Sequence, residues 1–237
     1  GGDIEIFFGG DSWMPAIDGT FLPDEPWRLL EQGKGNAVPL IAGTNRDEGE
    51  LFTFLGKDVT PKNEEEVREW LKVIGADGPA DSVDEVLALY PLGESRDAKA
   101  FVEDVITDST FVCPTRELLR GFHSAGVPAF RYAFDLSLEG GYFKDLGSFH
   151  AVEVPFVFGT SFVGGRISEE DQPVSEAMMG YWGSFALDGA PGGQEVAWPA
   201  YDTATDPFVR FAHPVKADEG LKSDICDFWD GIWASSR

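Results

Sequence analysis

The sequence predicts an α/β fold, and two kinds of pattern support this prediction. Short apolar runs at 38–42 and 129–135 have the length and the flanking residues of buried strands. Between them, residues 60–125 repeat apolar side chains at helical spacing, which indicates several successive helices. Each run is followed by a polar loop, and ligands of open α/β sheets bind at that end of the strands.

The other elements are predicted from turn, cap and periodicity signals. Asp18-Gly19 between apolar residues indicates a hairpin turn. Helices are expected at about 25–32, from 60, from 81, at 97–107, 114–122, 168–187 and 220–234, and a last strand at 207–211. The sequence contains no internal repeat and no low-complexity linker.

Composition argues against several kinds of partner. The chain has 237 residues, 42 acidic and 18 basic, and a net charge of -24. This charge would repel the phosphates of nucleic acid and an anionic membrane surface. Surface acidity usually serves solubility, although a negative field also draws cationic substrates. No apolar run approaches the ~18 residues of a membrane helix, so we expect neither nucleic-acid nor membrane binding.

Two loops carry the candidate catalytic side chains. Asp47 and Glu48 follow the first strand, and His150 lies among small residues after the second. An acid followed along the chain by a histidine matches the late part of the order Ser, Asp/Glu, His found in α/β-hydrolases. In such a triad the carboxylate orients the histidine. The residues alone leave open whether these are ordinary charged loops and which of the two acids acts.

The remaining polar residues suggest no cofactor. His123 ends a predicted helix and His213 precedes Pro214 in a loop, so both are expected near the surface. No two histidines stand four residues apart, and the acidic clusters lie at predicted helix starts, so we expect no metal site. Neither a P-loop nor a G-x-G-x-x-G turn is present, so we expect no nucleotide cofactor.

At these motifs the chain resembles the type-B carboxylesterase and cholinesterase family. The family's acid lies in a motif like Asn45-Arg46-Asp47-Glu48-Gly49, and its histidine in one like 150–159. The resemblance continues in order through 108–114, Tyr181-Trp182, Phe185-Ala186, Trp198-Pro199 and 226–229. It implies an α/β-hydrolase fold, a carboxylic ester substrate, Glu48 as the acid and His150 as the general base.

The resemblance also implies roles for further residues. Glu153 corresponds to an acid near the triad, although a glutamate at a helix start is also common. Residues 60–125 correspond to an insertion that lines the active-site gorge, and three aromatic residues are candidates for its apolar pocket: Phe52, Phe149 and Phe156. Cys113 and Cys226, which composition alone would treat as buried thiols, correspond to a disulfide, which favours secretion or another oxidising compartment.

One departure from the family pattern concerns the nucleophile. The family's serine lies in G-x-S-x-G, and this sequence has no such pentapeptide; Ser12, Ser148 and Ser184 all lack it. We therefore expect residues 1–237 to be the C-terminal half of one α/β-hydrolase domain, inactive alone and completed by an N-terminal half that carries the serine. The alternative is an adhesion or binding protein of the same superfamily, and the identity of that serine decides between them.

Overall fold

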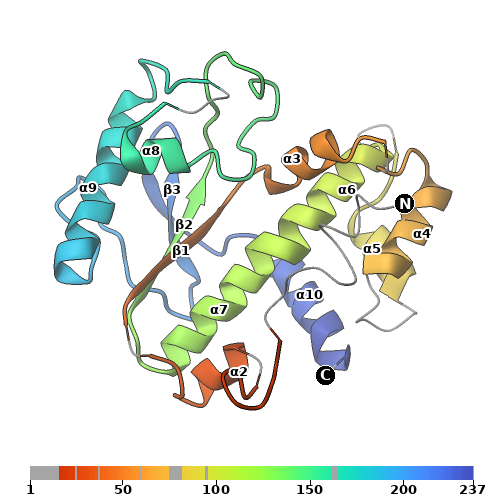
Figure 1. Cartoon of the computed structure of the whole chain (residues 1–237), viewed down its shortest axis with the longest axis horizontal. Helices are drawn as coiled ribbons and strands as arrows, with labels where there is room; N and C mark the ends of the chain where they lie inside the picture. Colours follow the sequence, from red (N-terminus) through yellow and green to blue (C-terminus); the bar gives the residue numbers. More distant parts are fainter. Residues whose placement is uncertain are drawn as a thin grey trace.

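The computed structural model describes residues 16–24, 26–36, 38–58, 60–74, 82–93, 96–161 and 165–236. Within these residues the chain forms a four-stranded sheet with helices packed on both sides and a helical lobe beside it (Figure 1). This arrangement confirms the predicted α/β class. Ser12, one of the serines considered in the sequence, lies outside the described residues.

The strands are β1 (Leu40–Asn45), β2 (Ala129–Phe134), β3 (Pro207–Phe211) and β4 (Lys216–Glu219), in that order across the sheet. The first three are parallel and β4 is antiparallel to β3. Strands β1, β2 and β3 were predicted. The polar strand β4 was not, because its exposed charged side chains carry no strand pattern, as is common at a sheet edge.

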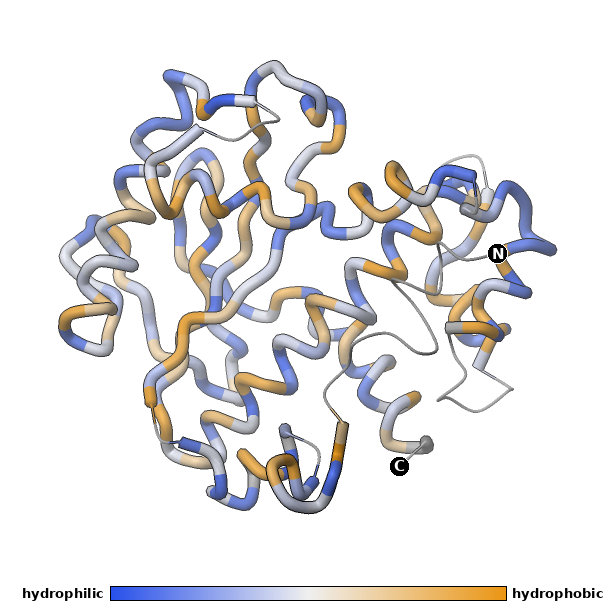
Figure 2. The backbone as a smooth tube through the Cα atoms, in the orientation of Figure 1, coloured by the Kyte–Doolittle hydropathy of each residue, from blue (hydrophilic) through white to orange (hydrophobic). Residues whose placement is uncertain are grey.

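Strand β1 extends three residues farther than its apolar run predicts. Gly43 pairs with Tyr132, and a Cβ on Gly43 would lie 2.3 Å from the Tyr132 ring. Because Gly43 has no Cβ, the Tyr132 ring can pack against β1 at this position, and the glycine does not end the strand. Figure 2 shows β1 changing from hydrophobic at its start to hydrophilic where it enters the acidic loop. This change places polar side chains at the C-terminal end of a buried strand.

Helices cover both faces of the sheet, as near-continuous apolar strands require. On one face, α8 (Val154–Phe158) and α9 (Gln172–Asp188) pack on an aromatic cluster that includes Phe134, Phe156 and Tyr181. On the other face, α7 (Cys113–Ser124) contacts β1 and β2 and packs against α2 (Pro26–Glu31). Figure 1 shows α9 and α7 on opposite sides of the strands.

The helical lobe has a core of its own. It contains α3 (Glu48–Leu55), α4 (Glu64–Ile74), α5 (Ser82–Leu89), α6 (Ala98–Ile106) and part of α10 (Ser223–Ser236). Helix α4 begins a few residues later than the sequence predicts. The reason is that Asn63 accepts a hydrogen bond from the Glu66 N–H and donates one to its carboxylate, which caps the helix there.

The third and fourth predicted helices of the 60–125 block form one continuous column. A π-helical turn, η1 (Thr107–Val112), joins α6 to α7. Figure 1 shows this column running from the lobe to beneath the sheet. The predicted block therefore has two parts, since α4, α5 and α6 belong to the lobe and α7 belongs to the sheet. Single π turns of this kind are rare and often lie at functional sites.

A disulfide joins Cys113, at the start of α7, to Cys226 in α10, with the Cα atoms 5.0 Å apart. Both cysteines are fully buried. The pairing implied by the family resemblance is thus confirmed, and it fits an oxidising compartment. No helix in the described part of the chain has the length and apolar character needed to cross a membrane.

Candidate active site

The acid loop places Glu48 at the first position of α3, directly after β1 ends at Asn45. The Glu48 side chain is only 6% exposed. Its Oε1 accepts a hydrogen bond from the backbone N–H of Asn45, with a distance of 2.8 Å. Because one oxygen is held by the backbone, the other is presented in a fixed direction.

That second oxygen meets His150. The distance between His150 Nδ1 and Glu48 Oε2 is 2.7 Å, and this hydrogen bond is the main reason why the pKa of His150 is raised. The His150 side chain is 43% exposed, and its Nε2 bonds to no residue that the structure describes. One ring nitrogen is thus held by a buried carboxylate and the other is available for proton transfer, which is the arrangement of a catalytic base.

Asp47 has a different role from Glu48. Its Oδ2 accepts a hydrogen bond of 2.8 Å from the Ser148 N–H, and its own N–H donates to the Ser148 carbonyl at 3.1 Å. Gly147 makes this approach possible, because a Cβ there would lie 2.3 Å from Asp47 Oδ2. The sequence alone did not decide whether Asp47 or Glu48 is the acid of the pair. In the structure Glu48 contacts the histidine, and Asp47 contacts the loop that carries the histidine.

Asn45 also ties the two loops together, through contacts that no sequence motif indicates. Its side-chain nitrogen donates to the Phe149 carbonyl at 2.9 Å and to the Glu153 carboxylate at 2.5 Å. Glu153 is one turn beyond His150, and burial is the main cause of its raised pKa. Ala151, next to the histidine, has a left-handed backbone with φ 69°. A non-glycine residue in this region indicates a backbone held by its surroundings.

Two aromatic rings flank the imidazole. The ring centroid of Phe52 lies 5.4 Å from that of His150, and the centroid of Phe111 lies 5.0 Å away. Phe52 was predicted. Phe111 was not among the predicted pocket residues, although it lies in the 108–114 motif. Its position beside the His150 ring depends on the π-helical turn η1.

The other two pocket candidates are placed differently. Phe149 and Phe156 are at most 1% exposed and belong to the aromatic core under α8 and α9. Phe156 packs on Phe134 with centroids 4.8 Å apart, and Phe149 packs on Phe143. A ring enclosed in this way cannot contact a substrate without unpacking the core, so the expectation of a pocket position is corrected for both.

The serines considered in the sequence are structural where they are described. The Ser148 hydroxyl is buried and donates to the Leu136 carbonyl at 2.7 Å. The Ser184 hydroxyl bonds the carbonyls of Tyr181 and Gly192 and accepts the Gly192 N–H. Neither hydroxyl is available as a nucleophile to His150.

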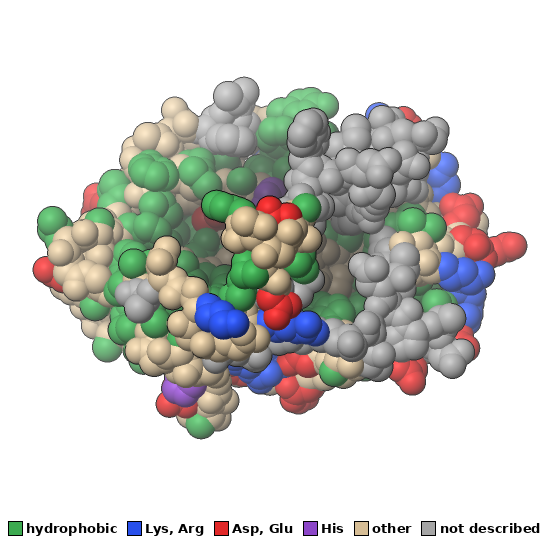
Figure 3. All heavy atoms as spheres, turned by 60° about the horizontal axis from the view of Figure 1, so that its bottom comes forward, with side chains coloured by type: hydrophobic (Ala, Val, Ile, Leu, Met, Phe, Trp, Pro, Cys, Tyr) green, Lys and Arg blue, Asp and Glu red, His purple; other side chains and the backbone are tan. Residues whose placement is uncertain are grey.

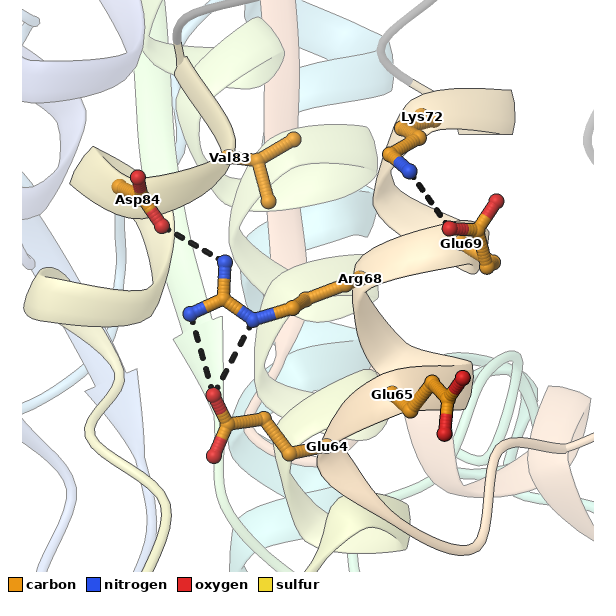
Figure 4. Close-up of a pocket in the computed structure, with 7 residues that line it drawn as sticks. All are labelled: Glu64, Glu65, Arg68, Glu69, Lys72, Val83 and Asp84. Carbon is orange, nitrogen blue, oxygen red and sulfur yellow. Dashed lines mark hydrogen bonds and ion pairs between the residues drawn. The ribbon is translucent and has the colours of Figure 1, made fainter.

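A pocket lies between α4 and α5 in the helical lobe, and neither Glu48 nor His150 lines it (Figure 4). Most of its charged side chains pair with one another, since Arg68 bonds both Glu64 and Asp84, and Lys72 bonds Glu69. Figure 3 shows mixed acidic and basic side chains at this end of the molecule. Among the described residues, no group of three His, Cys, Asp or Glu side chains is arranged to hold a metal ion.

Comparison with known proteins places this geometry in a family. The model of the carboxylesterase family matches residues 8–229. A medium-chain fatty acyl-CoA hydrolase precursor of Anas platyrhynchos is 32% identical over 231 residues, which cover 90% of this chain and 41% of that protein.

Two further relatives are similar over nearly the same span. The acetylcholinesterase of Bungarus fasciatus is 25% identical, over 92% of this chain and 39% of that protein. The cholinesterase of Mus musculus is 29% identical, over 95% of this chain and 39% of that protein. The chain therefore spans about two fifths of the length of the curated relatives it matches.

Proposed function

Because the chain belongs to the carboxylesterase family, whose fold is the α/β-hydrolase fold, we propose that it supplies the acid and the histidine of a Ser-Glu-His triad that hydrolyses carboxylic esters. The observation that carries this proposal is the 2.7 Å hydrogen bond between Glu48 and His150, with the other ring nitrogen of the histidine left available. The names of the relatives, which are an acyl-CoA hydrolase and two cholinesterases, support the same chemistry.

The proposed mechanism follows from the two ring nitrogens of His150. Nε2 takes the proton of a serine hydroxyl as the serine oxygen attacks the ester carbonyl, and then gives that proton to the leaving alcohol. Glu48, bound at Nδ1, holds the tautomer and stabilises the imidazolium that forms. Water then attacks the acyl-enzyme with His150 again as the base, which releases the carboxylic acid and restores the serine.

The serine and the oxyanion donors are proposed to come from an N-terminal part of the same enzyme that precedes this sequence. The absence of G-x-S-x-G from the sequence supports this, as does the coverage of about two fifths of the relatives. Strand β1 lies at the edge of the described sheet, so its outer side offers backbone groups to a further strand. Without that part, this chain is proposed to be inactive.

Three finer points belong to the same proposal. Phe52 and Phe111, which flank His150, form an apolar wall that suits a hydrophobic acyl or alcohol group. Helix α6 and the turn η1 pack against α3, which carries Phe52, and we propose that the 60–125 block lines the approach to this wall. The disulfide supports a secreted enzyme or one in another oxidising compartment.

The experiment that tests the function uses the complete protein in which this chain occurs. We expect p-nitrophenyl acetate to be hydrolysed, and kcat to fall by about 10⁴-fold in Glu48→Gln and at least as much in His150→Ala. Glu50→Gln is the matched control, because Glu50 lies on the same helix and faces Lys99 instead of the histidine. Full activity in Glu48→Gln would refute the role of Glu48 in the triad, and a complete protein that binds esters without cleaving them would favour a binding protein.

A further inference from the structure

Helix α3, which begins with Glu48, has no cap from its own sequence. The first N–H groups of a helix lack intrahelical partners, and the side chain of the preceding residue usually accepts one of them. Asp47 occupies that position but makes no such bond, because its carboxylate binds the Ser148 N–H and pairs with Arg46. The buried N–H of Gly49 therefore needs an acceptor from another part of the chain.

Thr107 supplies this acceptor. The Gly49 N–H donates to Thr107 Oγ1 at 3.0 Å, and both residues are buried. Gly49 also brings the two helices into backbone contact, since a Cβ on it would lie 2.2 Å from the carbonyl oxygen of Glu103. Because α3 lies this close to α6 and η1, the Thr107 hydroxyl occupies the place that a capping side chain or a water would otherwise take.

Two hydroxyl side chains of the π-helical turn η1, those of Ser109 and Thr107, bond in different ways. A serine or threonine hydroxyl inside a helix commonly bonds the carbonyl four residues earlier. Ser109, in the same turn, does so by donating to the Val105 carbonyl at 2.7 Å. Thr107 instead reaches across to α3, and Phe111, four residues later in the turn, contacts the His150 ring. One turn of η1 thus contacts both the acid's helix and the histidine.

We propose that Thr107 is a positioning residue for the acid: its hydroxyl caps α3 in place of Asp47 and so holds Glu48 within hydrogen-bond reach of His150. The proposal deepens the proposed function and rests on it for its catalytic meaning. Glu48 and Gly49 are the first two residues of α3, so any shift that gives the Gly49 N–H a new partner also moves the Glu48 carboxylate. His150 faces two carboxylates, Glu48 and Glu153, and only Glu48 is carried by this helix.

The test compares Thr107→Val, which keeps the shape and removes the hydroxyl, with Thr107→Ser, which keeps the hydroxyl. The measurement is the NMR titration of the histidine rings, with only this chain isotopically labelled in the complete protein. In Thr107→Val we expect the His150 midpoint to move down, toward that of an ordinary histidine, because its bond to Glu48 is loosened. In Thr107→Ser it stays in place. His123 and His213 are internal references, since neither contacts α3.

Amide exchange gives a second readout. The Gly49 N–H should be protected in the wild type and in Thr107→Ser, and should exchange roughly tenfold faster or more in Thr107→Val. Ser109→Ala, which removes the neighbouring hydroxyl of the same turn, should leave both the exchange and the titration unchanged. Equal His150 midpoints in the Val and Ser variants would overturn the proposal.

Two further outcomes are informative. If Thr107→Val does not fold, rapid exchange of Gly49 in the wild type still overturns the proposal, and slow exchange that Thr107→Ser preserves supports it. Neither readout requires ester hydrolysis. Protein that shows the titration shift but cleaves no ester would therefore refute the proposed function while supporting the positioning role.

Discussion

The Nδ1 of His150 lies 2.7 Å from Oε2 of Glu48, although the two residues are 102 positions apart in the chain. Side-chain hydrogen bonds from the acid loop also hold the histidine loop close to this contact. Asp47 bonds the backbone of Ser148, and Asn45 bonds the carbonyl of Phe149. The acid and the histidine are therefore preorganised by residues next to them in sequence, which is what a positioned catalytic pair requires.

The first prediction concerns the pH dependence of stability. Glu48 raises the pKa of His150 above its ordinary value of 6.5, so the folded chain keeps a proton that the unfolded chain releases. The contribution of this pair to the free energy of unfolding is thus fully present below pH 6.5 and is lost as pH rises through the folded pKa. In urea unfolding from about pH 5 to about pH 9, the advantage of wild type over His150→Gln should shrink as pH rises. A constant difference would contradict it.

The second prediction concerns the disulfide. Cys113 and Cys226 are 113 residues apart, and the chain-entropy model assigns a crosslink of this span about 5 kcal/mol of stabilisation. The double variant Cys113→Ser, Cys226→Ser should lose about 2–5 kcal/mol, measured by urea unfolding. Reductant should destabilise the wild type and leave the double variant unchanged. If reductant affects both equally, the effect does not come from this bond.

The sequence allowed the acid and the histidine to be predicted because each lies in a local motif. Asn45 to Gly49 and the segment from His150 are contiguous, and the strands before them are apolar runs bounded by turn residues. The family resemblance supplied the pairing of the two cysteines, which composition does not determine.

What the sequence did not reveal depends on contacts between segments. Thr107 and Ser109 are both hydroxyl residues in one helical turn, and no local pattern indicates which of them bonds outside its helix. Phe149 directly precedes the histidine motif and Phe156 lies within it, yet their rings turn into the core. Periodicity gives the face of a helix or strand, but not which segment will pack against it.

The third prediction concerns the packing of α3. Gly49→Ala should lower the free energy of unfolding by about 1–3 kcal/mol. The new Cβ would clash with the backbone of Glu103, and a backbone cannot shift aside as the end of a flexible side chain can. Gly183→Ala in α9 is the control: nothing lies within 4 Å of its Cβ position, so it should stabilise by up to about 1 kcal/mol. Urea unfolding measures both, and equal effects would show that the close approach at Gly49 is unimportant.

The last prediction contrasts two buried arginines that lie on the α7 side of the sheet. Arg116 is 1% exposed and pairs with Asp227 at 2.8 Å and Asp230 at 2.6 Å. Arg131 is equally buried, but it makes no ion pair within the described ranges, and its Nε and Nη1 have no hydrogen-bond partner there. Burial lowers the pKa of Arg131 to about 10, which reflects the cost of keeping this charge away from water.

Replacing each arginine by methionine should therefore have opposite effects. Arg116→Met removes the buried cation that pairs with Asp227 and Asp230, although Arg120 still pairs with Asp230 at 2.9 Å, and it should lower the free energy of unfolding by about 1–3 kcal/mol. Arg131→Met removes a charge that gains little from its surroundings and should raise it by about 1 kcal/mol or more. The two variants match in size and chemistry, so urea unfolding compares the settings directly. Strong destabilisation by Arg131→Met would mean that this guanidinium has a partner outside the described residues. The first candidate would be a carboxylate from the N-terminal part of the enzyme.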